Sequence, residues 1–355
     1  MKLLFSLLIC VFTFSAVAQN DETSKAKKFF NSGVAFYEKG DFTNAIKDFS
    51  KALEFRTKIS DSYLLCNLYL NRALCRMYLG SADAVNDAAE AVNLKPEYAR
   101  SYYVRAMAYA RIMHDFDKAV ADLDNALSLK PDEPDFLFLK ASCYREKKQP
   151  KESLKIINQI LEADSKSKEA LKERGSIYLE LHDYETAIKD FTKVLEYEPN
   201  NFGSLCNLAS CLCELKKFDE ALTYYLKAIE ADSTEAYVVY NNIGYFINFE
   251  QKDYKKAIEA FDKAIKCNPK FGYSYSNKGY AHYMLGDLKT AMREINKSLE
   301  LAPKNSYAFK NRALVFIAEN KISSACLDLQ KALDLGYSTQ YDDEVDKLMA
   351  KHCGK

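Results

Sequence analysis

Histidine, the side chain most often used for proton transfer near neutral pH, occurs only four times among the 355 residues. His114, His182, His282 and His352 are widely separated in the chain. The sequence contains no His-Glu-x-x-His zinc motif, no Gly-x-Ser-x-Gly turn for a nucleophilic serine and no glycine-rich phosphate loop. We therefore expect neither enzymatic activity nor a cofactor.

The ten cysteines offer a second kind of chemistry, metal binding or disulfide formation. Cys206, Cys211 and Cys213 are clustered, but no histidine lies near them and their spacing matches no common zinc pattern. Residues 206 and 213 would be about 10 Å apart along one helix, too far for a disulfide. We expect no metal site, and we interpret Cys75, Cys143 and Cys211 as small core residues.

Cys326 and Cys353 are the better candidates for a disulfide. A closing helix over about 341–353 is expected to fold back antiparallel to a helix over 324–335, which brings the two thiols near the same level. A bridge there would staple a C-terminal cap. The alternative is two unpaired cysteines, one buried and one on the tail.

One pattern, which occurs nine times in the sequence, predicts the elements that position these side chains. About twelve residues after each small residue comes a second small residue, and large apolar residues follow both. The gaps between successive copies are 40, 33, 35, 34, 34, 35, 35 and 34 residues. The first small residues are Gly33, Ala73, Ala106, Ala141, Gly175, Ala209, Gly244, Gly279 and Ala313.

Proline marks the ends of these copies. A proline has no N–H group, so it stops one helix and can begin the next. Small residues let two helices approach closely, and the large ones fill the space between neighbouring pairs. Each copy is therefore predicted to be a helix–turn–helix unit. The five prolines late in their copies are Pro96, Pro131, Pro199, Pro269 and Pro303.

The pattern resembles the tetratricopeptide repeat, whose signature places Gly or Ala eighth, Tyr eleventh, Ala twentieth, Phe or Tyr twenty-fourth and Pro thirty-second. Tyr178, Ala187, Phe191 and Pro199 match it closely in the fifth copy. The resemblance covers about residues 26–338. It implies an all-α, right-handed α-solenoid of about nine helix–turn–helix repeats, with a C-terminal capping helix and tail over 339–355.

Departures from the family pattern are local. Trp is absent throughout, and Arg76 and His282 replace the eleventh-position aromatic residue. The first copy is followed by about six extra residues, around 60–65, where we expect any hinge to lie. Because no linker rich in Gly, Ser or Pro interrupts the repeats, we expect one elongated domain.

If the hairpins pack as the resemblance implies, the first helix of each lines a concave face with its second, fifth, ninth and twelfth positions. These positions are apolar in copies one to three and charged in copies four and five. In the last copies they are polar and aromatic, which suits an extended polypeptide or a sugar. The alternative is that tyrosines only fill gaps between repeats. The candidate groove is Asn241, Tyr245, Asn248, Tyr273, Ser276, Tyr280, Tyr283 and Tyr307.

Some tetratricopeptide domains clamp a C-terminal carboxylate with Lys at the fifth position and Asn at the ninth. Here Lys172 is followed by Ser176, and Lys310 by Leu314, so the clamp is not assembled. The resemblance therefore implies a scaffold that binds a protein or peptide partner by another route. The alternative function is carbohydrate capture by the same tyrosines. The sequence does not indicate the oligomeric state.

Residues 1–18 have the pattern of a secretory signal. Lys2 precedes an apolar run over 3–14, and Ala16, Val17 and Ala18 form a small-x-small cleavage site. Acylation at Cys10 is disfavoured because Ile9 stands where lipoprotein signals have a small residue. We expect an exported protein, periplasmic or secreted, without membrane insertion after signal removal.

Charge is balanced, with 50 basic and 50 acidic side chains. A nucleic-acid-binding protein of this size usually shows an excess of positive charge. We therefore expect no nucleic acid partner.

Overall fold

The computed structural model describes residues 21–354, so the predicted signal over 1–18 and Cys10 lie outside the described residues. Over that range the chain is helical and contains no strand. It divides into two compact units, one ending at Ser165 and one beginning at Lys166. The described helices form nine hairpins, one for each copy of the sequence pattern, which confirms the predicted α-solenoid class.

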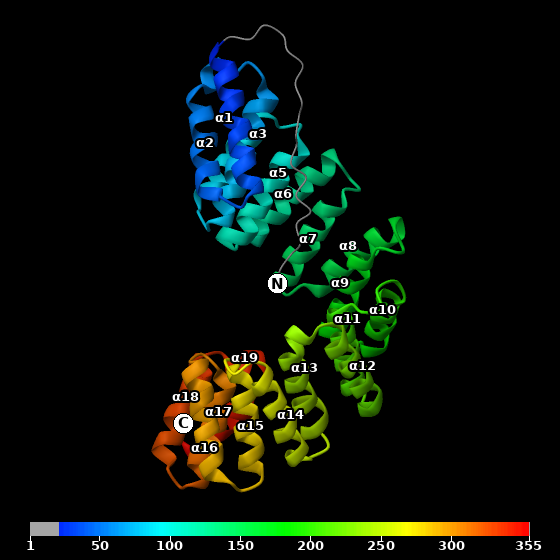
Figure 1. The fold of residues 1–355 in the computed structure, drawn as a ribbon, viewed down its shortest axis with the longest axis vertical. Coiled ribbons are helices and arrows are strands. Elements are labelled where there is room, and N and C mark those ends of the chain that lie inside the picture. Colours follow the sequence, from blue (N-terminus) through cyan, green and yellow to red (C-terminus); the bar gives the residue numbers. More distant parts are fainter. Residues whose placement is uncertain (1–20, 355) are drawn as a thin grey trace. The chain divides into compact units, whose positions relative to one another are not determined.

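The first unit contains four hairpins (Figure 1). A short 3₁₀ helix, η1 (Arg56–Lys58), follows the first of them, and a π-helical segment, η2 (Tyr109–Met113), extends α5. The paired helices are α1 (Asp21–Glu38) with α2 (Phe42–Glu54), α3 (Ser62–Tyr78) with α4 (Asp83–Leu94), α5 (Ala99–Ala108) with α6 (Phe116–Leu129), and α7 (Pro134–Glu146) with α8 (Pro150–Ala163).

The second unit contains five hairpins and a cap. A 3₁₀ helix, η3 (Ser233–Glu235), precedes α13, and a second π-helical segment, η4 (Ile243–Phe249), extends it. The cap is α19 (Tyr337–Gln340) and α20 (Glu344–His352). The pairs are α9 (Lys168–Glu180) with α10 (Tyr184–Tyr197), α11 (Phe202–Glu214) with α12 (Phe218–Ala231), α13 (Ala236–Asn242) with α14 (Tyr254–Cys267), α15 (Gly272–Met284) with α16 (Leu288–Leu301), and α17 (Ser306–Ala318) with α18 (Ile322–Asp334).

All nine small residues of the pattern are buried where the two helices of a hairpin cross. Four of them are glycines, and each lies against a large side chain of its partner helix. A Cβ atom added at Gly33 would lie 2.6 Å from Phe49 Cε1, and one at Gly244 would lie 2.5 Å from Phe261 Cε1. The small residues therefore permit a helix approach that larger ones would prevent.

Each hairpin turn contains one residue in the left-handed backbone region. Three of the nine are glycines, and one of these is Gly286, with φ 81°. Five of the others are Lys or His, including His114 with φ 51° and His182 with φ 59°. Two of the scattered histidines thus occupy turn positions of the fold. A side chain with a Cβ atom is strained in this region by about 1 kcal/mol or more.

A recurring ion pair ties the two helices of several hairpins together, and the sequence pattern did not reveal it. Arg105 Nη2 lies 2.7 Å from Asp122 Oδ1, and Arg105 Nε also donates to the same carboxylate. The aspartates are almost fully buried and the arginines half-buried, so each pair closes a polar contact inside the hairpin. Equivalent bidentate pairs are Arg72–Asp87, Arg174–Asp190 and Arg312–Asp328.

The segment that leads into the extra residues after the first hairpin is packed inside the first unit. Ile59 is buried, and Thr23 Oγ1 donates to the Lys58 carbonyl oxygen at 3.1 Å. The two compact units divide after Ser165, and a hinge at 60–65 stays a prediction.

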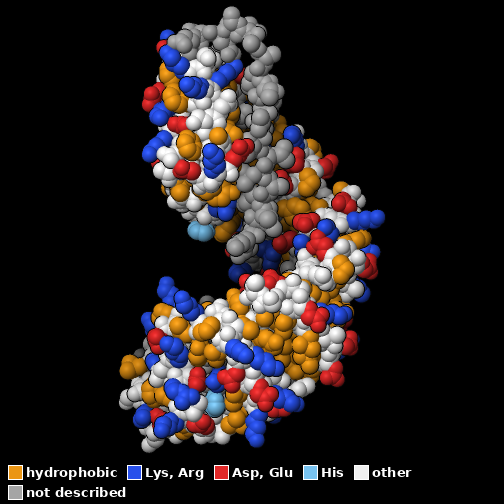
Figure 2. Space-filling view, viewed as in Figure 1, with side chains coloured by type: hydrophobic (Ala, Val, Ile, Leu, Met, Phe, Trp, Pro, Cys, Tyr) orange, Lys and Arg blue, Asp and Glu red, His pale blue; other side chains and the backbone are white. Residues whose placement is uncertain are grey.

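On the face shown in Figure 2, Lys and Arg side chains are interspersed with Asp and Glu side chains over each unit. This distribution agrees with the balanced composition of the whole chain. Among the residues that the structure describes, no helix is both long and apolar enough to cross a membrane.

Candidate functional site

The predicted groove residues lie on the first helices of the last three hairpins, all within the second unit. Asn241, Tyr245 and Asn248 belong to α13 and η4, Tyr273 to Tyr283 to α15, and Tyr307 to α17. Helix α13 contacts α15, and α15 contacts α17. The stripe therefore extends across three neighbouring helices.

Four of the predicted tyrosines join an aromatic cluster. The ring centroid of Tyr245 lies 5.8 Å from that of Phe249 and 6.3 Å from that of Tyr307. The Tyr280 ring lies 5.5 Å from Phe249 and 6.0 Å from Tyr283. Such centroid distances are those of favourable edge-to-face and offset contacts. The cluster thus has a packing role in addition to any binding role.

A pocket of about 540 Å³ opens beside this cluster, and we call it the aromatic pocket. Its surface is mainly polar, and Glu214 and Glu250 are among its lining residues. Lys216 also lines it, and its Nζ lies 3.3 Å from Glu250 Oε2. Its aromatic lining residues are Tyr245, Phe246, Phe249, Tyr254, Tyr280 and Tyr307.

The π-helical segment η4 places three of these aromatic residues. Ala257 follows Gly244 by thirteen positions, whereas Ala187 follows Gly175 by twelve, which is the interval in most copies. A π-helical turn absorbs one extra residue within a helix and occurs often at functional sites. Tyr245, Phe246 and Phe249 lie on this turn. The interval of thirteen is the sequence signal that identifies it.

The polar groove residues are engaged between neighbouring repeats. Asn241 Oδ1 accepts hydrogen bonds from Asn277 Nδ2 at 3.0 Å and from Ser274 Oγ at 3.2 Å. One repeat further on, Ser276 Oγ accepts a bond from Asn311 Nδ2 at 3.1 Å. These side chains are buried or half-buried, as is Asn248, and the hydrogen bonds join the first helices of neighbouring hairpins.

Lys310 is the charged residue at the back of the tyrosine cluster, and only 2% of it is exposed. Its Nζ lies 4.4 Å from the Tyr307 ring centroid and 5.0 Å from that of Tyr280. The same atom forms an ion pair with Glu344 Oε2 of α20 at 3.1 Å. Burial lowers the pKa of Lys310, while the Glu344 carboxylate favours its charged form.

The C-terminal cap covers the Tyr307 end of the stripe, which the sequence did not predict. Tyr337 is almost fully buried, and its ring stacks on Tyr307 at 6.2 Å. The Tyr341 ring lies 5.5 Å from Tyr307. Burial raises the pKa of Tyr307 above its ordinary value, and it raises that of Tyr280 to about 12. Tyr273, in contrast, is 48% exposed.

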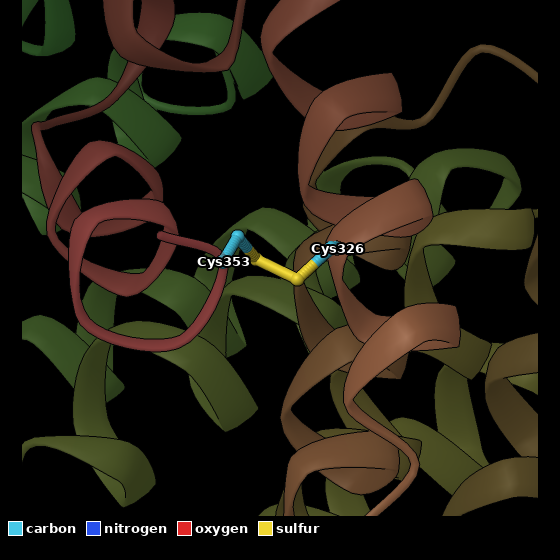
Figure 3. The surroundings of a disulfide bond; sticks show 2 residues. All are labelled: Cys326 and Cys353. Atoms are coloured by element: carbon cyan, nitrogen blue, oxygen red, sulfur yellow. A yellow bond between two sulfur atoms is a disulfide. The ribbon is translucent and has the colours of Figure 1, made fainter. Parts of the chain in front are cut away.

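A disulfide joins Cys326 of α18 to Cys353 after α20, with Cα atoms 5.7 Å apart (Figure 3). Helix α20 contacts α18, as expected for a cap stapled by this bridge. Mass spectrometry of the non-reduced protein tests the bond, because two free thiols would contradict it.

The remaining described cysteines have no arrangement suited to chemistry. Cys75, Cys143 and Cys211 are buried to 1% exposure or less, which confirms their interpretation as core residues. Burial raises the pKa of Cys75 and Cys211 to about 12, so both stay protonated and unreactive at neutral pH. Within residues 21–354, no group of three or more His, Cys, Asp or Glu side chains is placed to hold a metal ion.

Several models of one family match this chain, and together they cover more than half of it. A model described as TPR repeat matches residues 247–286. Models described as tetratricopeptide repeat match residues 26–58, 110–173, 169–201, 191–223 and 273–305.

Known proteins are similar over part of their length. Tetratricopeptide repeat protein 4 of Mus musculus is 27% identical over 132 residues, 37% of this chain and 33% of that protein. The protein of the same name from Homo sapiens is 25% identical over 165 residues, 46% of this chain and 42% of that protein. The match thus spans less than half of each relative.

The crystal structure of the yeast Tom70 is similar over nearly the full length of both chains. The comparison covers 94% of this chain and 96% of that chain, with a TM-score of 0.50 and 16% sequence identity. At this identity the similarity concerns the fold alone.

Proposed function

Because the chain belongs to the tetratricopeptide repeat family, we propose that it is a non-enzymatic scaffold that binds a partner polypeptide. Arrays of this kind act through the surface that their helices present, and no catalytic group is needed. The observation that carries the proposal is the aromatic pocket, which opens on the first helices of consecutive hairpins.

The aromatic pocket has the features of a peptide-binding surface. Its volume of about 540 Å³ accommodates one or two side chains of an extended chain. Tyr245 and Tyr280 provide broad contact area at a small cost in conformational entropy, and their hydroxyl groups suit a polar backbone. Lys310 is buried against Glu344, so capture of a C-terminal carboxylate at that lysine is disfavoured.

A peptide library displayed on phage and selected against the purified chain tests this proposal. We expect enriched peptides whose binding is lost when Tyr245, Tyr280 and Tyr283 are replaced together by Ala. Circular dichroism checks that the variant keeps its helices, and Glu259→Gln, an exposed change on α14, is the control. If no peptide is enriched, or if the triple variant binds as well as the original chain, the proposal is wrong.

Aromatic rings also stack on sugars, so the same chain is tested against immobilised polysaccharides. Retention on polysaccharide without any peptide enrichment would favour the alternative function, carbohydrate capture. The engaged amides of Asn241 and Asn277 favour the polypeptide, because they have fewer free donors and acceptors for sugar hydroxyls.

We also propose that the chain is exported, on the pattern of residues 1–18. Amino-terminal sequencing of the protein from its native cell should give a mature chain that begins at Gln19. A chain that starts at Met1 would contradict export through this signal.

A further inference from the structure

We propose that the aromatic pocket binds a cationic side chain, arginine or lysine, of the partner polypeptide. This inference rests on the proposed function and specifies the chemistry that the scaffold recognises. It follows from three features: the arrangement of the pocket's rings, the carboxylates on its wall and a buried lysine that lies against two of those rings.

The rings of the pocket are arranged to surround a guest on several sides. The Phe249 ring meets that of Tyr245 at a tilted angle and that of Tyr280 edge to face, with centroid distances of 5.8 and 5.5 Å. They are half-buried, so part of each ring faces the pocket. Aromatic faces attract cations through the ring quadrupole, and a group of rings at different angles is the arrangement that binds ammonium groups.

The charges beside the rings are mainly negative. Glu214 and Glu250 are exposed on the pocket wall, and only Lys216 opposes them, through its ion pair with Glu250. The Glu214 carboxylate accepts a hydrogen bond from the Tyr184 hydroxyl at 3.5 Å, and no ion pair neutralises it among the described residues. Burial is the largest cause that raises the pKa of Tyr245, and the carboxylates of Asp342, Glu250 and Glu214 raise it further.

The chain already places one cation against two of these rings. Lys310 Nζ lies 4.4 Å from the Tyr307 centroid and 5.0 Å from the Tyr280 centroid, inside the protein. Glu344 balances the charge of Lys310, so this lysine does not cancel the effect of Glu214 and Glu250. Tyr280 and Tyr307 thus accept an internal cation and also line the pocket.

Other guests fit the pocket less well. An acidic side chain would meet Glu214 and Glu250, and like charges disfavour binding. An aliphatic side chain would leave the polar pocket surface without partners. An arginine side chain offers five donors and a flat surface that stacks on tyrosine, whereas lysine offers a compact charge.

Three fluorescein-labelled glycine- and serine-based peptides test the inference, identical except for two central residues: arginine, lysine or citrulline. Citrulline has nearly the shape of arginine but no charge. Fluorescence anisotropy with the full chain should show that the arginine peptide binds about fivefold tighter than the citrulline peptide, with the lysine peptide between them. The difference should shrink as salt rises.

The double variant Glu214→Gln and Glu250→Gln should remove most of the preference for arginine over citrulline. Both side chains are exposed, so this variant is expected to fold. The control Glu259→Gln changes an exposed acid on neighbouring α14 that does not line the pocket, and it should leave the preference unchanged.

Equal binding of the arginine and citrulline peptides would overturn the inference. So would phage-selected peptides that require Tyr245 and Tyr280 but contain no excess of Arg or Lys, and in that case the proposed scaffold function stands. Failure of the chain to bind any peptide would instead contradict the scaffold function itself.

Discussion

The third and seventh hairpins contain the same irregularity, yet they use it differently. Ala106 and Ala119 are thirteen positions apart, as are Gly244 and Ala257, and a π-helical segment absorbs the extra residue in both hairpins. In the third hairpin, η2 lies beside the turn, where Asp115 N donates to the carbonyl oxygen of Tyr109, six residues back. The equivalent bond in the other hairpins spans five residues.

In the seventh hairpin the π-helical segment begins earlier, and the turn keeps its ordinary hydrogen bond from Asp253 N to the Asn248 carbonyl oxygen. The extra residue therefore changes the direction of Tyr245 and Phe246 in mid-helix instead of lengthening the turn. Tyr109 is the one aromatic residue on η2, whereas η4 carries Tyr245, Phe246 and Phe249, all three of which line the aromatic pocket. The position of the insertion and its side chains decide whether a π-helical turn contributes to a pocket.

The two hairpins also differ in how their helices are joined. Arg105 and Asp122 form a bidentate ion pair in the third hairpin. At the equivalent places the seventh hairpin has Ile243 and Ala260, both buried. We infer that the third hairpin has a structural role and that the seventh combines structure with binding.

The largest effect is expected from Asp122→Ala. It leaves the Arg105 guanidinium, 20% exposed, without its partner, and the free energy of unfolding should fall by about 3 kcal/mol. Urea denaturation followed by circular dichroism measures this change. Arg105→Ile with Asp122→Ala gives the third hairpin the residue types of the seventh and should recover most of the loss. A single variant as stable as the original chain would contradict the role of the pair.

Deletion of one residue from each π-helical segment tests the comparison most directly. Removing Phe246 gives the seventh hairpin the spacing of the fifth, and peptide binding should weaken about tenfold because the remaining rings are redirected. Removing Met113 does the same to the third hairpin and should leave binding unchanged. Phe246→Ala keeps the extra residue and separates loss of the ring from loss of spacing. Equal losses from both deletions would refute the distinction.

Gly244→Ala should destabilise the seventh hairpin by about 1 kcal/mol. The new Cβ atom would lie 2.5 Å from Phe261 Cε1, and the cost of this overpacking exceeds the gain in helix propensity. Phe261→Leu introduced together with it recreates the Ala106 and Leu123 pair of the third hairpin and should restore part of the stability. Thermal denaturation compares the three proteins, and a stabilised single variant would show that Phe261 moves freely.

The smallest effect is expected at the turns. His114 and Lys252 have φ values of 51° and 57°, and glycine adopts this region without strain. His114→Gly and Lys252→Gly should each stabilise the chain by about 0.5 kcal/mol, measured by urea denaturation. Glycine at Lys130, where φ is −142°, is the control and should stabilise nothing.

The repeat architecture was predictable because its causes are local and occur nine times. Small residues such as Gly33 and Gly175 recur at a period set by the size of a hairpin, and their positions alone locate the helix crossings. The π-helical turns are harder to predict because an interval of thirteen differs from twelve by one residue, although the sequence contains that difference between Gly244 and Ala257.

The details of the site were less predictable because they depend on contacts between residues far apart in the chain. Position on a helix face indicated that Asn241 and Ser276 point toward a groove, but not that Asn277 and Asn311 donate to them. Lys310 and Glu344 lie on different helices and are 34 residues apart in the sequence, so the repeat pattern does not predict their ion pair.

The placement of the sulfur atoms has a consequence for refolding the protein in the laboratory. The disulfide joins Cys326 to Cys353, whereas Cys66, Cys75, Cys143 and most other described thiols are free and become buried only once their hairpins have packed. If oxidant is added while those thiols are still accessible, thiol–disulfide exchange can trap mispaired chains. Refolding under reducing conditions, with oxidation afterwards, should therefore give the higher yield of native protein.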